Sequence, residues 1–225
     1  MLLGPQCPRR MVTSPLDTRP YSVVHALFPL VARPLFGFHV QGTEHIPPTG
    51  PVVLASNHLS NIDPFFLGAA CPRQIHWMAK SELWKVRVLG RVVERLGAFP
   101  VRRGEADRES VRAGLDILNH GAVLGIFPEG HRQRSGRLGQ PAPGVGLFSS
   151  RDGVVTIPVA VTGTNRITGD GHFRFARVTV TFGPPVDVTV PGATKSERNR
   201  VISHRIMQAL ARLLGQEWQS LEDNG

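Results

Sequence analysis

The chain has 225 residues, of which 41% are hydrophobic and 19% charged, a composition typical of a folded globular protein that excludes a disordered one. The length suffices for one domain, or for one domain with an appendage. Lys and Arg number 26 against 17 Asp and Glu, and the formal charge of +9 predicts an anionic partner, which could be a phosphate ester, nucleic acid or an acidic bilayer.

The first 40 residues differ in composition from the rest. Residues 1–20 are rich in Pro and Arg and lack periodicity, so we expect a mobile arm. Residues 21–40 are apolar, but His25, Pro29, Arg33 and Pro34 interrupt them. A helix that spans a bilayer needs roughly 20 consecutive apolar residues, so this segment is not expected to cross one. This segment is expected either to lie on a membrane surface or to pack into the core. Residues 41–225 are expected to form a single domain.

Strand and helix patterns alternate after residue 41. The apolar run 122–127 is of the kind buried on both faces of a sheet, and Thr194 with Glu197 predicts a capping box at the start of the last helix. Such alternation favours an α/β fold in which helices flank a sheet. The predicted strands are 52–55, 75–78, 97–103, 122–127, 154–163 and 178–182. One predicted helix begins at residue 63, and two others span 82–96 and 105–120, the second of which is closed by Gly121.

Four segments place polar, charged or conformationally special residues at the ends of predicted strands. They are "NHLSNID" from residue 57, "GAFPVRR" from 97, "FPEGHR" from 127 and "IPVAV" from 157. Because α/β folds build their sites at the ends of strands, we expect these segments to come together.

His58 and Asp63 are candidates for a catalytic dyad. An imidazole can accept a proton from an attacking hydroxyl, and a carboxylate on its other ring nitrogen would fix the tautomer and stabilise the imidazolium. Spacing alone leaves another interpretation open, in which Asp63 is the N-cap of a helix with Pro64 at its first position. Neither Ser56 nor Ser60 lies in a Gly-x-Ser-x-Gly elbow, so the nucleophile is expected to be a substrate hydroxyl.

Charged side chains in the second and third segments could bind a phosphate. Arg132 directly follows a buried strand and could clamp a phosphate monoester, as could Arg102 or Arg103. Glu129 could accept hydrogen bonds from loop amides or substrate hydroxyls. The alternatives are an ordinary Pro-Glu-Gly turn and a solvated strand end.

Taken together, the four segments resemble the four sequence blocks of the glycerophospholipid acyltransferase family, whose best-known members are the lysophosphatidic acid acyltransferases. Asn57-His58 with Asp63 matches the block N-H-x4-D, and Gly97 with Arg103 matches a block of glycine, hydrophobic residues and arginine. The run 127–130 with Arg132 matches F-P-E-G-T-R-S, and 157–159 matches the fourth block. Order and spacing agree over residues 40 to 185.

The resemblance implies a role for each matched residue. His58 would be the general base and Asp63 its orienting partner, and Pro158 would shape the pocket. The acceptor's glycerol phosphate would be bound by four residues, Arg103, Glu129, Gly130 and Arg132. The implied fold is a mixed, largely buried sheet flanked by helices, with an N-terminal apolar helical segment.

The chain departs from the family pattern next to the implied phosphate site. His131 stands where the family usually has threonine, and Gln133 where it often has serine. Pro100 replaces a large apolar residue, and Arg102 occupies a frequently acidic position, so either Arg102 or Arg103 could hold the phosphate. These departures bear on the identity of the acceptor.

The resemblance implies transfer of a fatty acyl group from acyl-CoA or acyl carrier protein to the free hydroxyl of 1-acylglycerol-3-phosphate, forming phosphatidic acid, with no metal or bound cofactor. The alternatives are the same chemistry on glycerol 3-phosphate, another lysolipid or a glycolipid, and a non-catalytic basic protein that binds membrane or nucleic acid. Nucleic acid is not expected as a partner, because the sequence lacks a helix-turn-helix, RNP or zinc signature.

The expected location is the cytoplasmic face of a membrane, to which the protein binds peripherally. Cys7 and Cys71 show neither metal-ligand spacing nor a disulfide framework, which favours a reducing compartment. A basic surface would attract an anionic leaflet. Lys85 with Arg87, Arg91 and Arg95 could face lipid headgroups or form a solvated helix face.

Overall fold

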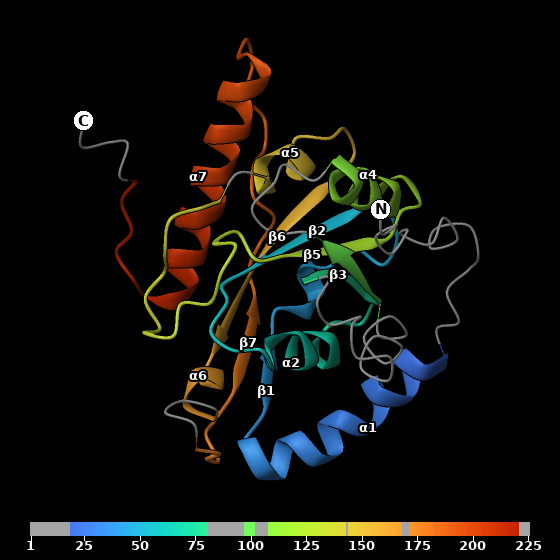
Figure 1. Ribbon diagram of the computed structural model, residues 1–225, viewed down its shortest axis with the longest axis vertical. Coiled ribbons are helices and arrows are strands. Elements are labelled where there is room, and N and C mark those ends of the chain that lie inside the picture. The colour runs from blue at the N-terminus through green and yellow to red at the C-terminus, as the bar shows by residue number, and fades with distance from the viewer. Residues whose placement is uncertain (1–18, 81–96, 102–107, 143, 168–171, 221–225) are drawn as a thin grey trace, which may run out of the picture.

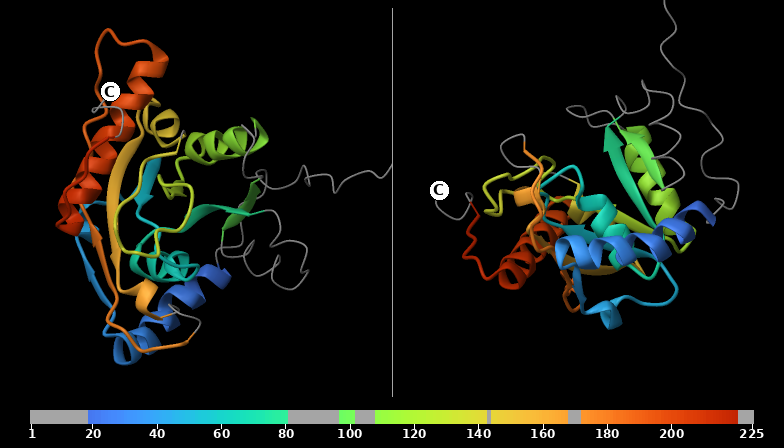
Figure 2. Two further views of the ribbon diagram at one scale, coloured as in Figure 1. Left: turned by 60° about the vertical axis from the view of Figure 1, so that its left-hand side comes forward. Right: turned by 90° about the horizontal axis from the view of Figure 1, so that it is seen from below.

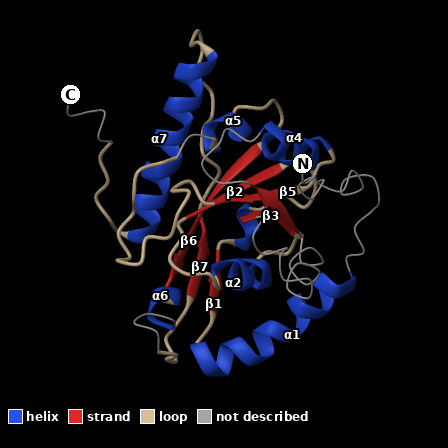
Figure 3. Cartoon of the chain, in the orientation of Figure 1, coloured by secondary structure: helices blue, strands red, loops and turns tan. Residues whose placement is uncertain are grey.

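The computed structural model describes residues 19–80, 97–101, 108–142, 144–167 and 172–220, which form a sheet with helices packed on both faces (Figure 1). Figure 3 shows the strands at the centre and the helices around them. In the described residues the sheet has seven strands, in the order β1-β7-β6-β2-β5-β3-β4. Their bounds are β1 (His39–Gln41), β2 (Val52–Ser56), β3 (Ile75–Lys80), β4 (Ala98–Val101), β5 (Val123–Ile126), β6 (Val155–Thr162) and β7 (Thr179–Phe182).

Strand direction decides where side chains can meet. The pairs β6–β2, β2–β5, β5–β3 and β3–β4 are parallel, whereas β7 is antiparallel to β6 and parallel to β1. The predicted mixed α/β sheet is therefore confirmed. The carboxyl ends of β2 and β5 lie side by side at one edge, so the segments that follow them are neighbours in space.

Two helical layers cover the sheet. The helices are α1 (Arg19–Phe36), α2 (Asp63–Ala70), α4 (Arg108–Asn119), α5 (Val145–Ser149), α6 (Thr164–Ile167) and α7 (Lys195–Leu214), with a 3-10 turn η1 (Thr43–His45). Val52 and Leu54 of β2 pack in the core beneath α1 and α2, whereas Val53 and Ala55 pack beneath α4, α5 and α7. Figure 2 shows α7 on one side of the sheet and α2 on the other. Burial on both faces explains the continuous apolar runs of the central strands.

Local signals predicted the start of α7 and the end of α4. The capping box is present, with Oγ1 of Thr194 accepting from the Glu197 amide and Glu197 accepting from the Thr194 amide. Gly121 has a φ of 69° and closes α4 by donating to Leu118. The predicted strands are confirmed with small shifts of their ends. The predicted helix 82–96, with its basic stripe, and residues 1–18 of the arm lie outside the described residues.

The apolar segment 21–40 contains two elements, since α1 ends at Phe36 and β1 begins at His39. One face of α1 packs on α2 through Phe28 and Ala32, and the hydroxyl of Tyr21 donates to the carbonyl oxygens of Gly68 and Arg73. The opposite face is exposed. Among the described helices, none is both long and apolar enough to cross a bilayer.

Candidate active site

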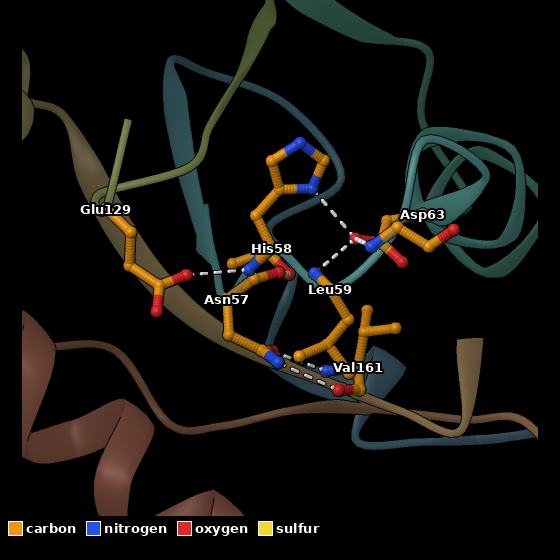
Figure 4. A network of polar contacts seen from close by, with 8 residues as sticks. Asn57, His58, Leu59, Asp63, Glu129 and Val161 are labelled. Carbon is orange, nitrogen blue, oxygen red and sulfur yellow. Dashed lines mark hydrogen bonds and ion pairs between the residues drawn. The ribbon is translucent and has the colours of Figure 1, made fainter. Parts of the chain in front are cut away.

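Asn57 extends the β2 ladder by one residue through its side chain. Its Nδ2 donates to the Val161 carbonyl at 2.9 Å, and its Oδ1 accepts from the Val161 amide at 2.7 Å (Figure 4). Both residues are buried. The carboxamide thus pairs with β6 as a main-chain peptide would, and it holds the backbone immediately before His58.

The side chains of His58 and Asp63, the candidate dyad, contact each other. Nδ1 of His58 lies 2.8 Å from Oδ2 of Asp63, and the same oxygen accepts the amides of Leu59 at 2.7 Å and Ser60 at 2.8 Å. Because its partner is a carboxylate, Nδ1 is the nitrogen that donates, and in the neutral imidazole this tautomer presents Nε2 as the acceptor. Nε2 points away from Asp63 (Figure 4), and the His58 side chain is 8% exposed. The geometry therefore suits a general base.

The prediction that Asp63 is the N-cap of its helix is wrong. The N-cap of α2 is Ile62, Asp63 is the first helical residue, and no side-chain capping bond is present. The reason is that Oδ2 of Asp63 turns back toward residues 58–60, while Oδ1 is buried and has no partner among the described residues. The carboxylate still lies at the positive end of the α2 dipole, which favours its charge.

The imidazole of His58 is one layer of a stack of three rings. Its centroid lies 3.9 Å from that of Phe127 at an interplanar angle of 16°, and Phe127 lies 4.9 Å from Trp77 at 15°. A Cβ at Gly125 would lie 2.6 Å from the Trp77 ring, so this glycine makes room for the indole. Sequence reasoning missed the stack, although a glycine inside an apolar strand signals a close approach.

Glu129 ties the loop after β5 to the backbone of His58. Oε2 accepts the His58 amide and Oε1 the Gly139 amide, each at 2.8 Å, while the Gln133 amide donates to the His58 carbonyl at 2.7 Å. Glu129 is 2% exposed, and this burial raises the pKa of its carboxyl above the ordinary value. Of the two roles left open by the sequence, the structure places Glu129 among loop amides.

The loop that carries Arg132 is basic. Gly130 has a φ of 68°, and Arg132 is half-buried with no hydrogen bond or ion pair to the described part of the chain. His131 and Gln133 contact each other, with 3.0 Å between their Nε2 atoms. Residues 130–151 contain no acid. The Arg132 guanidinium is therefore available to bind an anion.

Pro158, another predicted site residue, is not part of this cluster. Pro158 lies inside β6, paired in register with Ala55, and not at a strand end as predicted for the fourth segment. It lines a cavity of about 410 Å³ together with residues of α7 and of the loop 184–187. Arg102 and Arg103 lie outside the described residues. In the described ranges, no three His, Cys, Asp or Glu side chains gather as a metal would require.

Comparison with known proteins identifies the region that carries these residues. A family model described as Acyltransferase matches residues 37–162, more than half of the chain. A chloroplastic 1-acyl-sn-glycerol-3-phosphate acyltransferase of Arabidopsis thaliana is 26% identical over 68% of this chain and 44% of its own length. A 1-acyl-sn-glycerol-3-phosphate acyltransferase of Bacillus subtilis is 35% identical over 43% of this chain and 49% of its own length. One of Streptococcus pneumoniae is 28% identical over 78% of this chain and 65% of its own length. The chain thus spans less than two thirds of each relative.

A solved structure shares the fold. The 1-acyl-sn-glycerophosphate (LPA) acyltransferase PlsC from Thermotoga maritima has a TM-score of 0.68 and is 19% identical, with 86% of this chain and 79% of that chain covered. The family match contains His58, Asp63, Glu129 and Arg132 and ends at Thr162, so α7 and the segment after it lie beyond the match.

Proposed function

The chain belongs to the acyltransferase family, and from this membership we propose that it transfers a fatty acyl group from an acyl thioester to the free hydroxyl of 1-acylglycerol-3-phosphate. The product would be phosphatidic acid, and the donor acyl-CoA or acyl carrier protein. The names of the relatives in plants and bacteria support this choice of acceptor.

The observation that carries the proposal is the buried contact between His58 and Asp63. Nε2 of His58 would take the proton of the acceptor hydroxyl while the oxygen attacks the thioester carbonyl. The tetrahedral intermediate would then collapse with cleavage of the C–S bond, and the departing thiolate would take the proton from His58. Asp63 would hold the ring in place and stabilise the imidazolium between these steps. No protein nucleophile is needed.

Arg132 would bind the acceptor's phosphate. Its guanidinium has no partner in the described residues, and it stands three residues after Glu129, which contacts the backbone of His58. A guanidinium can hold two phosphate oxygens at once. Glu129 and Gly130 would shape the loop without touching the phosphate, because both Glu129 oxygens already accept amides. Arg102 or Arg103 remains a second proposed phosphate ligand.

We also propose that the protein binds peripherally to an anionic bilayer, on its cytoplasmic face. Support comes from an apolar patch on α1 and the adjacent segment 173–175, beside the exposed arginines Arg33, Arg174 and Arg177. A basic residue near an anionic leaflet contributes about 1 kcal/mol of attraction. The members of the apolar patch are Val23, Leu27, Leu30, Val31, Leu35, Phe173 and Phe175.

The test is acyl transfer by the purified chain to a panel of acceptors with labelled acyl-CoA, with and without anionic vesicles. We expect labelled phosphatidic acid, its loss in His58→Ala, and a raised acceptor KM in Arg132→Ala. Wild-type turnover in His58→Ala would overturn the mechanism. The enzyme could instead prefer glycerol 3-phosphate, or a lysolipid without a phosphomonoester, over 1-acylglycerol-3-phosphate. That result would overturn the proposed identity of the acceptor but would leave the proposed acyl-transfer reaction standing.

A further inference from the structure

The segment after α7 lies against the loop that follows β5. Oε1 of Gln216 accepts the Leu138 amide at 2.9 Å, and Nε2 of Gln216 donates to the Gly136 carbonyl at 2.7 Å. The indole Nε1 of Trp218 donates to the Gly139 carbonyl at 2.9 Å. In Figure 1 this loop runs in yellow-green beside the lower end of α7, where the red C-terminal segment begins. Two side chains of the C-terminal segment thus bond to main-chain groups of residues about 80 positions earlier in the sequence.

The contacted loop leads directly to the dyad. The carbonyl of Gly139 accepts from Trp218, while its amide donates to Oε1 of Glu129 at 2.8 Å. The other oxygen of Glu129 accepts the amide of His58, also at 2.8 Å. Hydrogen bonds therefore join Trp218 to the backbone of His58 through one residue, Gly139, and one carboxylate, that of Glu129.

The C-terminal segment is itself anchored to α7. Gly215 ends the helix with a φ of 62°, and the Gln216 amide donates to the Ala211 carbonyl at 2.9 Å. The Trp218 ring lies edge-on to His204, with 5.8 Å between centroids, and Ser220 Oγ lies 3.2 Å from His204 Nε2. A packed helix therefore fixes the position from which Gln216 and Trp218 reach the loop.

We propose that Gln216 and Trp218 are positioning residues that hold Glu129, and through it His58, in the geometry for proton transfer. The inference rests on the proposed function for its kinetic consequence. It concerns residues beyond the family match, which ends at Thr162, and neither side chain is placed against the reacting atoms. The contacts of Gln216 and Trp218 with residues 136–139, called the C-terminal clasp below, would also hold the loop that carries Arg132 against the dyad.

The test uses the full chain with two variants and a control. Trp218→Phe keeps a smaller aromatic ring but removes the N–H that donates to Gly139, and Gln216→Ala removes both of its side-chain bonds to the loop. Glu217→Gln alters the exposed side chain between them, which makes no described bond to the loop. We expect the two variants, and not the control, to lower kcat about 10- to 100-fold with the acyl-CoA KM unchanged, since a small misplacement at a distance has an effect of that size.

Hydrogen exchange separates a positioning role from simple packing. In both variants we expect faster amide exchange in peptides covering residues 57–60 as well as 136–140. Faster exchange confined to 136–140 and the C-terminal segment, with wild-type kcat, would overturn the inference. If the wild type transfers no acyl group to 1-acylglycerol-3-phosphate, the proposed function fails. Amide exchange at residues 57–60 still decides whether the C-terminal clasp stabilises the backbone of His58.

Discussion

Nδ1 of His58 and Oδ2 of Asp63 lie 2.8 Å apart, and that single carboxylate oxygen also accepts two main-chain amides of the intervening turn. Three donors converge on one acceptor, so the carboxylate is fixed by the backbone before it orients the ring. The turn and the dyad are therefore one structure. Five-residue spacing works here because residues 59–62 reverse the chain, with the Asp63 amide donating to the Ser60 carbonyl.

Asp63→Asn should separate charge from orientation. The amide oxygen can still accept the three donors, so we expect a melting temperature near that of the wild type, while kcat falls about 10²- to 10⁴-fold because no negative charge stabilises the imidazolium. Asp63→Ala should lose kcat and also destabilise the fold, by about 1–3 kcal/mol for each amide left unpaired. Steady-state kinetics with thermal melts checks both. An Asn variant with wild-type kcat would remove the charge from the mechanism.

Asn57→Asp should weaken the junction between β2 and β6. Aspartate can still accept the Val161 amide but cannot donate to the Val161 carbonyl, so two buried acceptors would face each other. We expect a loss of about 1–3 kcal/mol in the free energy of unfolding, measured by urea denaturation. Asn119→Asp is the matched control, because this exposed side chain only accepts from Arg151. Equal stability of the two variants would contradict the pairing with Val161.

Much of the fold could be predicted because its signals are local. Continuous apolar runs mark strands buried on both faces, and the pair Thr194 and Glu197 marks a helix start within four residues. β1 was missed because three residues are too few to make a pattern.

The candidate site could be predicted only where it is local in sequence. The pair His58 and Asp63 could be predicted because one turn joins them. The stack of His58 on Phe127 joins residues 69 apart in the chain, and the Trp218 contact with Gly139 joins residues 79 apart. Such contacts exist only once the sheet has aligned its strand ends, so no local pattern reports them. For the same reason, the sequence left both roles of Glu129 open.

Gly125→Ala should disturb the ring stack from beneath. The added Cβ would lie 2.6 Å from the Trp77 ring and 2.7 Å from Ile75, so the indole must shift, and with it Phe127 under the His58 imidazole. We expect a loss of about 1–3 kcal/mol of stability by denaturation and a lower kcat. Gly68→Ala is the control, since its Cβ would make ordinary contacts with Tyr21 and favour helix α2. If both variants match the wild type, the stack does not constrain His58.

The apolar patch should contribute to vesicle binding in proportion to its burial in lipid. Leu27 and Leu30 are 56% and 66% exposed, so the double change Leu27→Ser, Leu30→Ser should leave the far-ultraviolet spectrum unchanged. Since each leucine contributes roughly 1.5–3 kcal/mol when fully buried, we expect at least about tenfold weaker partition into anionic vesicles by cosedimentation. Arg151→Gln alters an exposed residue just beyond α5, away from the patch, and controls for charge. Unchanged partition of the double variant would place the membrane contact elsewhere.

Glu129→Gln should change both activity and the pH dependence of stability. The carboxylate accepts two amides, one on each oxygen, whereas a glutamine has only one acceptor oxygen. Either the Gly139 or the His58 amide would therefore face an NH₂ group and lose its acceptor. We expect kcat to fall about tenfold or more.

Stability gives a separate test of the same carboxyl. Burial raises the pKa of Glu129, against the opposing effect of the Gly139 and His58 amides, so the folded chain keeps this proton to a higher pH than the unfolded chain does. Between the two pKa values the native state binds more protons, and the free energy of unfolding therefore falls as pH rises through that window and is level above it. Glutamine has no proton to lose, so the stability of the wild type relative to Glu129→Gln should decline across the window in urea titrations at successive pH values. The exposed Glu217→Gln serves as the control. A difference that grows with pH would mean that the amide bonds outweigh burial and that the carboxylate, not the acid, is the favoured buried form.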